Sequence, residues 1–203
     1  MGYPINGLWD RPILSYSDKN GDGKLSEAEI VVGDTQVYRG STLPKYEAGI
    51  ANNFGFLRNT LHLSTTFDYR GQFWNQWGYQ NQRCVSTGNC RAVNDPNAPL
   101  ADQAAAIMGG SSLNRTLWGF FVQNDFVRFR EMSVSYDLPQ KITRGFGRIH
   151  PVSAVLTGRN IGVLWTKYPG LDPESNVSAG SANNDFYAEP PLRYFIGRIN
   201  VSY

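Results

Sequence analysis

The segment at residues 126–139, FVRFREMSVSYDLP, constrains the fold of this chain more than any other stretch. Apolar side chains occupy every second position in its second half, at Met132, Val134, Tyr136 and Leu138. Successive side chains of a β-strand point to opposite faces, so this alternation predicts a strand with one apolar and one polar face. Pro139 has no amide hydrogen to donate and is expected to end the strand.

The alternation slips by one residue in the first half of this segment. Val127 and Phe129 have the opposite parity from Met132, and arginines stand between them. Two explanations remain open. Either a β-bulge lies near Glu131, or the strand leaves its apolar surroundings at that point.

Four further segments alternate in the same way, at residues 45–54, 61–70, 152–159 and 194–203. The first two form a hairpin pattern with a short connection between them. Ten residues are enough to cross a bilayer when a strand is tilted, whereas strands of soluble sandwiches average about 5 or 6. The connections are alternately short and long, which is typical of outer-membrane barrels. The sequence therefore predicts an all-β fold with about five antiparallel strands.

Composition agrees with a β-rich chain and excludes two classes of protein. Aromatic residues make up 13% of the chain and charged residues only 18%. No stretch approaches the roughly 18 consecutive apolar residues of a membrane helix, so helical membrane proteins are excluded. The net charge of +2 is small and the basic residues are dispersed, so a nucleic-acid partner is not expected.

The most specific motif is the segment at residues 18–29, DKNGDGKLSEAE. Its spacing matches the EF-hand calcium loop, which takes oxygen ligands from positions 1, 3, 5, 7, 9 and 12 and has glycine at position 6. Those positions are Asp18, Asn20, Asp22, Lys24 (through its backbone carbonyl), Ser26 and Glu29, with Gly23 at the turn. We therefore expect a structural Ca²⁺ site.

No amphipathic helix precedes this loop, so the prediction is a lone calcium loop that fixes one chain segment. Such a loop is a poor candidate for a calcium sensor. The alternative is a metal-free surface turn rich in Asp, Asn and Gly.

Residues 71–125 form a long insertion that contains both cysteines of the chain. Cys84 and Cys90 flank a small, flexible segment, which favours a local disulfide and an oxidising compartment. The alternative is two free thiols. Residues 100–108, LADQAAAIM, are a helix candidate that the following pair of glycines should stop.

Two tryptophans of this insertion, Trp74 and Trp77, are candidates for stacking on a sugar or another planar ligand. The simpler interpretation is that they pack within the loop or join an aromatic girdle. No nucleophile elbow, glycine-rich phosphate loop or histidine metal set occurs in the sequence, so we do not expect an enzyme.

Several blocks of the sequence resemble SusC/RagA-type TonB-dependent outer-membrane transporters. FVRFREMSVSYDLP, VLTGRNIGVLWTKYPGLDPE and RYFIGRINVSY are similar to the last strands of these proteins. DKNGDGKLSEAEI, VYRGSTLPKYEAGI and TTFDYRGQFWNQW resemble the part that precedes them. The resemblance covers nearly the whole chain in matching order, and the terminal Tyr203 also fits the family.

The resemblance implies a plugged transmembrane barrel of the order of 22 strands, of which residues 1–203 would be a C-terminal part. Such transporters import oligosaccharides, peptides or similar nutrients with energy from TonB, usually beside a SusD-type surface lipoprotein. Five strands cannot close this barrel, and the first residues contain no secretory signal, so we expect a fragment or a truncated gene product.

The resemblance also implies an orientation in the outer membrane. The chain would end in the periplasm, and the loops at residues 18–29, 71–125 and 169–191 would be extracellular. Residues 132–138 would face lipid, whereas residues 126–130 would rise above it, where arginines meet headgroups or loop carboxylates.

A binding module is the alternative class of protein. A secreted, calcium-stabilised β-sandwich could hold glycans on Trp74 and Trp77. The two hypotheses differ in what covers the apolar strand faces, which is lipid for the transporter and a second sheet for the sandwich.

Overall fold

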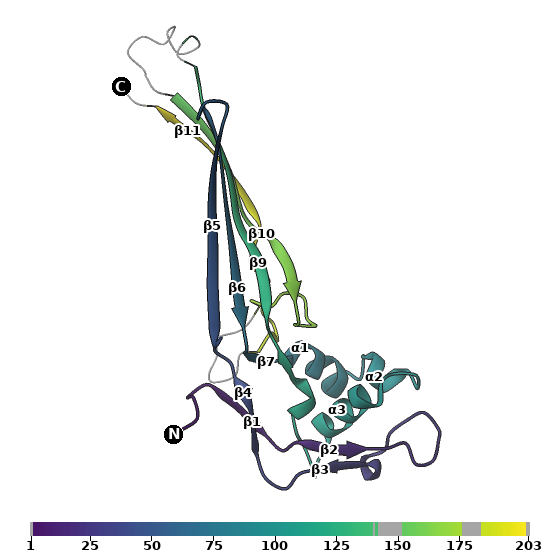
Figure 1. The fold of residues 1–203 in the computed structure, drawn as a ribbon. Coiled ribbons are helices and arrows are strands. Elements are labelled where there is room, and N and C mark those ends of the chain that lie inside the picture. The colour runs from purple at the N-terminus through teal and green to yellow at the C-terminus, as the bar shows by residue number, and fades with distance from the viewer. Residues whose placement is uncertain (1, 140, 142–151, 176–183, 202–203) are drawn as a thin grey trace. The chain divides into compact units, whose positions relative to one another are not determined.

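The computed structural model describes residues 2–139, 141, 152–175 and 184–201 (Figure 1). The chain divides into two units. The first consists of residues 1–45, 71–125 and 167–190, and the second of residues 46–70, 126–166 and 191–203.

The second unit contains a five-stranded sheet with the order β11-β10-β9-β6-β5. Its strands are β5 (Tyr46–Phe56), β6 (Leu61–Gly71), β9 (Phe126–Asp137), β10 (Val152–Thr166) and β11 (Tyr194–Val201). The β6–β9, β9–β10 and β10–β11 pairs are antiparallel. The predicted all-β fold class is therefore confirmed, with all five predicted strands present. Across the described residues the sheet is open, and β11 and β5 form its edges.

A tight connection joins β5 to β6, as the hairpin pattern predicts. Leu57, Arg58 and Asn59 have φ values of 51°, 56° and 67°, which places three successive residues in the left-handed region. The Thr60 amide donates to the Phe56 carbonyl at 3.1 Å and closes the turn. β5 begins one residue later than predicted, at Tyr46, and ends two residues later, at Phe56.

A one-residue bulge in β9 accounts for the slipped alternation. Thr66 of β6 pairs with Glu131, but its neighbour Phe67 pairs with Phe129, so Arg130 is the extra residue. The bulge explanation is thus confirmed. That residues 126–130 rise above the lipid stays a prediction, and the extra residue returns Phe129 to the apolar face. The Phe67 and Phe129 rings stack there with centroids 4.5 Å apart.

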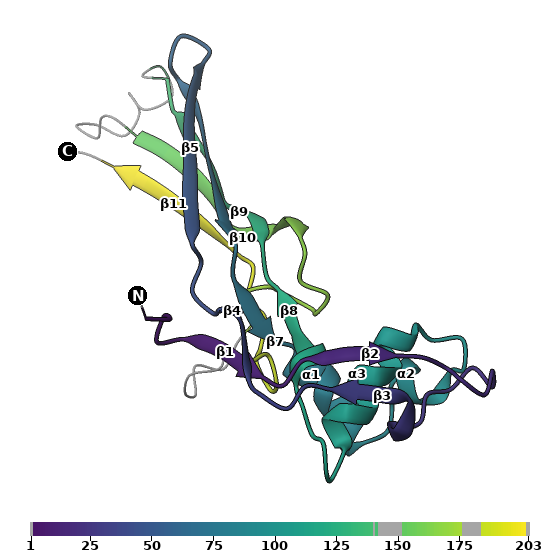
Figure 2. The same ribbon diagram turned by 60° about the horizontal axis from the view of Figure 1, so that its bottom comes forward.

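The first unit combines three small sheets with a helical insertion (Figure 2). The sheets pair β1 (Gly7–Asp10) with β4 (Val37–Ser41), β2 (Ile13–Tyr16) with β3 (Ile30–Val32), and β7 (Trp74–Gln76) with β8 (Phe121–Gln123). The helices are α1 (Gly78–Asn81), a π-helical turn (Gln82–Ser86), α2 (Arg91–Asn94) and α3 (Leu100–Gly110). Single 3₁₀ turns occupy Glu27–Glu29 and Trp118–Phe120.

Helix α3 confirms the predicted helix but does not stop before its glycines. Both Gly109 and Gly110 belong to the helix, and Ser111 follows it. A Cβ at Gly109 would lie 2.8 Å from a ring carbon of Phe120, so close packing explains a glycine inside the helix.

Helix α3 contributes to both hydrophobic clusters of the first unit. One cluster contains Ala104 and Met108 with Leu25 and Ile30. Leu25 lies within the acidic loop at residues 18–29, and Ile30 directly follows it. The other is formed by Cys84, Cys90, Ala105, Ala106 and Phe120. Among the described residues no helix is both long and apolar enough to cross a membrane.

Candidate functional site

The five-stranded sheet has one continuous apolar face. Strand register and alternation place on it Tyr46, Ile50, Phe54, Leu61, Leu63, Phe67, Tyr69, Val127, Phe129, Met132, Val134, Tyr136, Leu156, Phe195, Ile199 and Val201. Many of these side chains are open to the surroundings: Ile50 is 61% exposed, Leu156 60% and Ile199 73%. A contiguous exposed apolar surface of this kind marks an interaction with lipid or with another protein.

The opposite face of the sheet is polar and is stabilised by cross-strand pairs. Arg159 forms an ion pair with Glu131 at 2.7 Å, and Arg130 of the bulge pairs with Asp68. Hydroxyl groups of Ser133 and Thr157 lie 2.8 Å apart. Further pairs on this face are His62 with Asp137, Glu47 with Arg70, Ser64 with Asn53 and Asn200 with Ser153. The polar face is therefore suited to water.

The dimensions of the strands fit a membrane wall. The strands of this sheet contain 8 to 15 residues, and a tilted transmembrane strand needs about 9 to 11. In outer-membrane barrels in general, the apolar face of the strands meets lipid and the polar face lines the interior. The sheet can thus separate an apolar from an aqueous environment.

The predicted calcium loop folds as consecutive tight turns closed by its own amides. Gly21 and Gly23 have φ values of 73° and 79°, a conformation that glycine adopts without steric cost. The two carboxylate oxygens of Asp18 accept the amides of Gly21 and Gly23 at 2.8 and 2.9 Å. Asp22 accepts the amide of Lys24 at 2.8 Å. The loop is therefore ordered by the side chains that the motif supplies.

Glu29 closes the loop from its far end. Its Oε2 accepts the backbone amide and the hydroxyl of Ser26, each at 2.8 Å, and its Oε1 accepts the amide of Lys19 at 2.8 Å. These bonds, led by that of the Ser26 amide, lower the pKa of Glu29 from 4.5 to about 2. The carboxylate is consequently ionised at neutral pH.

The donor chemistry of this loop fits a hard cation, since it supplies carboxylate, amide and hydroxyl oxygens. A carboxylate oxygen that accepts one amide hydrogen still has a lone pair for a metal. Across the described ranges, however, no three Asp, Glu, His or Cys side chains are grouped so that they could hold a metal ion. Asn20 instead donates to Asp22 at 3.0 Å, a bond that a shared cation would replace. Calcium binding therefore stays a prediction.

The predicted disulfide between Cys84 and Cys90 is confirmed. The two Cα atoms are 5.0 Å apart, and the bridge links the π-helical turn to the start of α2. Both sulfur-bearing side chains are buried against Ala105 and Phe120. The bridge is thus part of the core that holds the insertion together.

Trp74 packs inside the first unit with Arg39, a residue that the sequence patterns did not single out. The Arg39 guanidinium lies 4.3 Å from the Trp74 ring centre and 4.6 Å from that of Trp118. A Cβ at Gly40 would overlap the Trp74 ring, so the strand β4 also touches this side chain. Trp77 is half-buried. The structure thus gives Trp74 an internal partner, and ligand stacking on either tryptophan stays a prediction.

No protein-family model matches the sequence, and no curated protein matches it. Solved structures do match the fold. The RagAB peptide importer in its open-open state gives a TM-score of 0.67 at 18% identity, covering 97% of this chain and 22% of that one. The RagAB peptide transporter gives 0.64 at 18% identity, covering 100% and 23%. The importer in its closed-closed state gives 0.67 at 17% identity, covering 100% and 24%.

These matches establish the fold of the chain. It corresponds over its whole length to a segment of a transporter structure, and it spans about a quarter of the length of those chains. The other three quarters of those transporter chains have no counterpart in residues 1–203.

Proposed function

We propose that this chain forms part of the barrel wall of an outer-membrane nutrient importer of the SusC/RagA type that its sequence resembles. The observation that carries the proposal is the five-stranded sheet with a continuous apolar face and a polar face full of cross-strand ion pairs. The likeness to the RagAB importer structures supports it independently.

The remaining features of an importer belong to the same proposal. The barrel would be completed by further strands and a plug, powered through TonB, and accompanied by a SusD-type surface lipoprotein. The structural neighbours are described as peptide importers, which favours peptides over oligosaccharides as the cargo. The loop at residues 18–29 and the disulfide-bearing insertion would lie outside the cell, and the end of the chain in the periplasm. The role is transport, with no catalytic step.

Adjacent residues at the middle of β5 provide a matched test. Ile50 lies on the apolar face and Ala51 on the polar face, and both are exposed. Arginine at a lipid-facing position near the bilayer centre costs about 2–4 kcal/mol, whereas positions inside the barrel tolerate it. We expect Ile50→Arg, but not Ala51→Arg, to reduce recovery of the chain in an outer-membrane fraction. Equal recovery of the two variants would contradict a lipid-facing role.

The alternative glycan-binding sandwich requires a second sheet over the apolar face. Within the described residues of the second unit there is one sheet, and its apolar side chains are exposed. This observation favours the transporter. A folded, monodisperse protein in buffer without detergent would reverse the preference.

We also propose that the loop at residues 18–29 binds Ca²⁺ and stabilises the segment between β2 and β3. Support comes from the spacing of its oxygen donors and from the turn geometry at Gly21 and Gly23. Titration calorimetry on the intact chain should show heat of binding and a raised melting temperature with Ca²⁺. Asp18→Asn should weaken both effects, while absence of heat in the unaltered chain would refute the site.

A further inference from the structure

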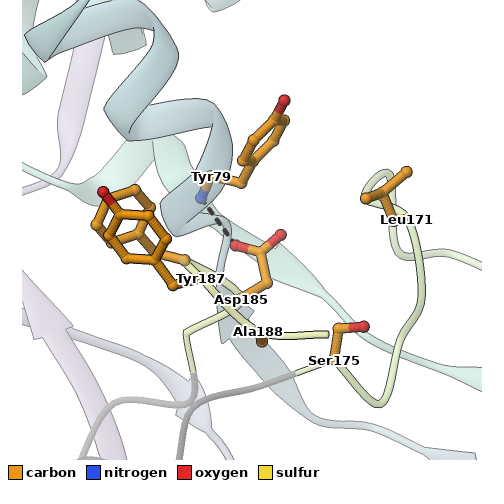
Figure 3. Close-up of a pocket in the computed structure, with 7 residues that line it drawn as sticks. Tyr79, Leu171, Ser175, Asp185, Tyr187 and Ala188 are labelled. Atoms are coloured by element: carbon orange, nitrogen blue, oxygen red, sulfur yellow. Dashed lines mark hydrogen bonds between the residues drawn. The ribbon is translucent and has the colours of Figure 1, made fainter. Parts of the chain in front are cut away.

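A pocket of about 190 Å³ lies in the first unit, and nothing in the proposed transport role assigns it a ligand (Figure 3). Its lining comes from two segments far apart in sequence, the start of α1 and the stretch after β10. Figure 3 shows Asp185 with Tyr79, Ser175, Leu171 and Tyr187 around it. Each of these side chains contributes a different part of the recognition chemistry.

The segment that carries Asp185 is held firmly against α1. Gln76 forms a β-bridge with Asn184, and a Cβ at Gly78 would overlap the Asn184 side chain. The Asn184 side chain accepts the amide of Phe186 at 2.8 Å and so shapes the turn. The position of the carboxylate that follows Asn184 is therefore set by backbone contacts.

Among the described residues that line the pocket, Asp185 supplies the only charge. It is 8% exposed, and its Oδ1 accepts the amide of Tyr79 at 2.8 Å. Burial, together with the neighbouring Asp185 carboxylate, raises the pKa of the Tyr168 hydroxyl, so that hydroxyl stays neutral beside the carboxylate. The described lining includes no Lys, Arg or His. A buried carboxylate in such a setting attracts a cation.

Ser175 provides a hydrogen-bonding position that the chain itself does not use. It is 4% exposed, and its hydroxyl has no hydrogen-bond partner among the described residues. The turn that bears it is anchored, since Asn124 donates to the Pro173 carbonyl at 2.7 Å. Buried polar groups in native proteins normally have partners, so this hydroxyl is an unsatisfied polar group beside the pocket, covered from the pocket space itself.

The remaining walls are aromatic and apolar. Tyr79 is 47% exposed, and Leu171 and Tyr187 are mostly exposed, although each lines the pocket. The Phe186 and Tyr187 rings contact each other with centroids 4.0 Å apart. Aromatic faces attract organic cations, and an apolar cavity of roughly 150 Å³ already accommodates benzene.

We infer that this pocket binds a primary ammonium group attached to an aromatic or large apolar side group. The ammonium pairs with Asp185, while the apolar group lies against Tyr79, Leu171 and Tyr187. Free aromatic amines and the N-terminal residue of a peptide share this chemistry. The inference stands on the pocket alone and does not depend on the transport role.

Binding of phenethylammonium to the intact chain tests the inference, measured by calorimetry or by NMR shifts. Asp185→Asn should weaken binding at least about tenfold, as expected for loss of a buried charge pair. Asp34→Asn makes the same chemical change at an exposed residue outside the pocket and should leave the affinity unchanged. Equal affinities for the two variants, or no binding to the unaltered chain, would overturn the inference.

Further measurements distinguish loss of binding from misfolding and show which kind of amine is the ligand. Tyr187 is 85% exposed, so Tyr187→Ala should fold normally and bind several times more weakly. The neutral isostere 2-phenylethanol should not bind, and equal binding of it would overturn the role of charge. A Phe-Ala dipeptide that binds better than phenethylammonium, with no binding after N-acetylation, would identify a peptide N-terminus as the ligand.

Discussion

Glu29 is the residue whose ionisation stabilises the acidic loop. It receives hydrogen bonds from the Ser26 amide, the Lys19 amide and the Ser26 hydroxyl. Protonation of the carboxylate converts one of its acceptor sites into an O–H donor and removes the negative charge that strengthens these hydrogen bonds. The stability of the loop is therefore coupled to pH through Glu29.

The pKa of Glu29, lowered from 4.5 to about 2, sets the range of this coupling. Because the folded-state pKa is below the unfolded one, the stabilisation is complete above about pH 4.5 and declines as the pH falls towards 2. We expect the Glu29 carboxyl resonance to titrate with a midpoint near pH 2. Glu29→Gln should remove this acid dependence, and a midpoint near 4.5 in the unaltered chain would contradict the hydrogen-bond geometry.

Gly40 is a residue where steric contact decides which side chain is allowed. An added Cβ would overlap the Trp74 ring that rests on the Arg39 guanidinium. We expect Gly40→Ala to lower the free energy of unfolding by about 1–3 kcal/mol, as overpacking does elsewhere. Gly2→Ala is the control, because nothing lies within 4 Å of a Cβ there. Denaturant unfolding followed by tryptophan fluorescence measures both, and equal stabilities would show that Trp74 moves freely.

At the scale of the element, the bulge in β9 determines which residues face which side. Arg130 is the extra residue, and it keeps Val127 and Phe129 on the apolar face with Met132. The pairing of β10 with β9 is also irregular beside the bulge. Arg159 pairs with Glu131, but the next pair joins Gly162 to Phe129. The irregularity thus runs through neighbouring strands.

Insertion of a residue next to Arg130 should therefore damage the sheet more than loss of the Arg130 side chain does. One more residue at the bulge would turn Phe129 to the polar face and Arg128 to the apolar face, since side chains alternate along a strand. We expect insertion of an alanine after Arg130 to prevent folding into membranes or detergent. Arg130→Ala removes only the partly exposed ion pair with Asp68 and should cost at most about 1 kcal/mol. Similar yields of folded protein for the insertion and the substitution, judged by β-sheet circular dichroism, would argue against a role for the bulge.

At the scale of the whole molecule, the two units depend on different interactions. The first unit relies on two hydrophobic clusters and the Cys84–Cys90 bridge. The second is a sheet whose polar face is internally paired and whose apolar face is exposed. The two units should respond separately to chemical perturbation.

Reduction of the disulfide tests this separation. The bridge spans a sequence separation of 6, for which the chain-entropy model gives about 2 kcal/mol of stabilisation. We expect reduction to accelerate amide hydrogen exchange in α3 and at Trp118–Phe120, which pack on the two cysteines, and to leave β5, β6 and β9 unchanged. A Cys84→Ala, Cys90→Ala variant should show the same exchange with and without reductant. Faster exchange throughout the five-stranded sheet would contradict two separate units.

The sequence by itself determined the five long strands, the polarity of their faces, the β5–β6 hairpin, helix α3 and the pairing of the two cysteines. These features depend on local patterns: alternation with a period of 2, a turn between two apolar runs, and two cysteines with one partner each. The loop at residues 18–29 was recognised from spacing for the same reason. Its turns are built by side chains within 5 positions of the amides that they accept, apart from Glu29, which reaches back 10 residues to Lys19.

Only the tertiary structure decided where the bulge lies, how far α3 extends, and what surrounds Trp74 and Asp185. The bulge at Arg130 follows from pairing with β6 and β10, and a glycine stands at position 109 inside the helix because Phe120 packs against it. Asp185 meets the Tyr79 amide across 106 positions of sequence. Contacts between residues so far apart in sequence produce no periodic pattern of residue types, so local sequence patterns cannot predict them.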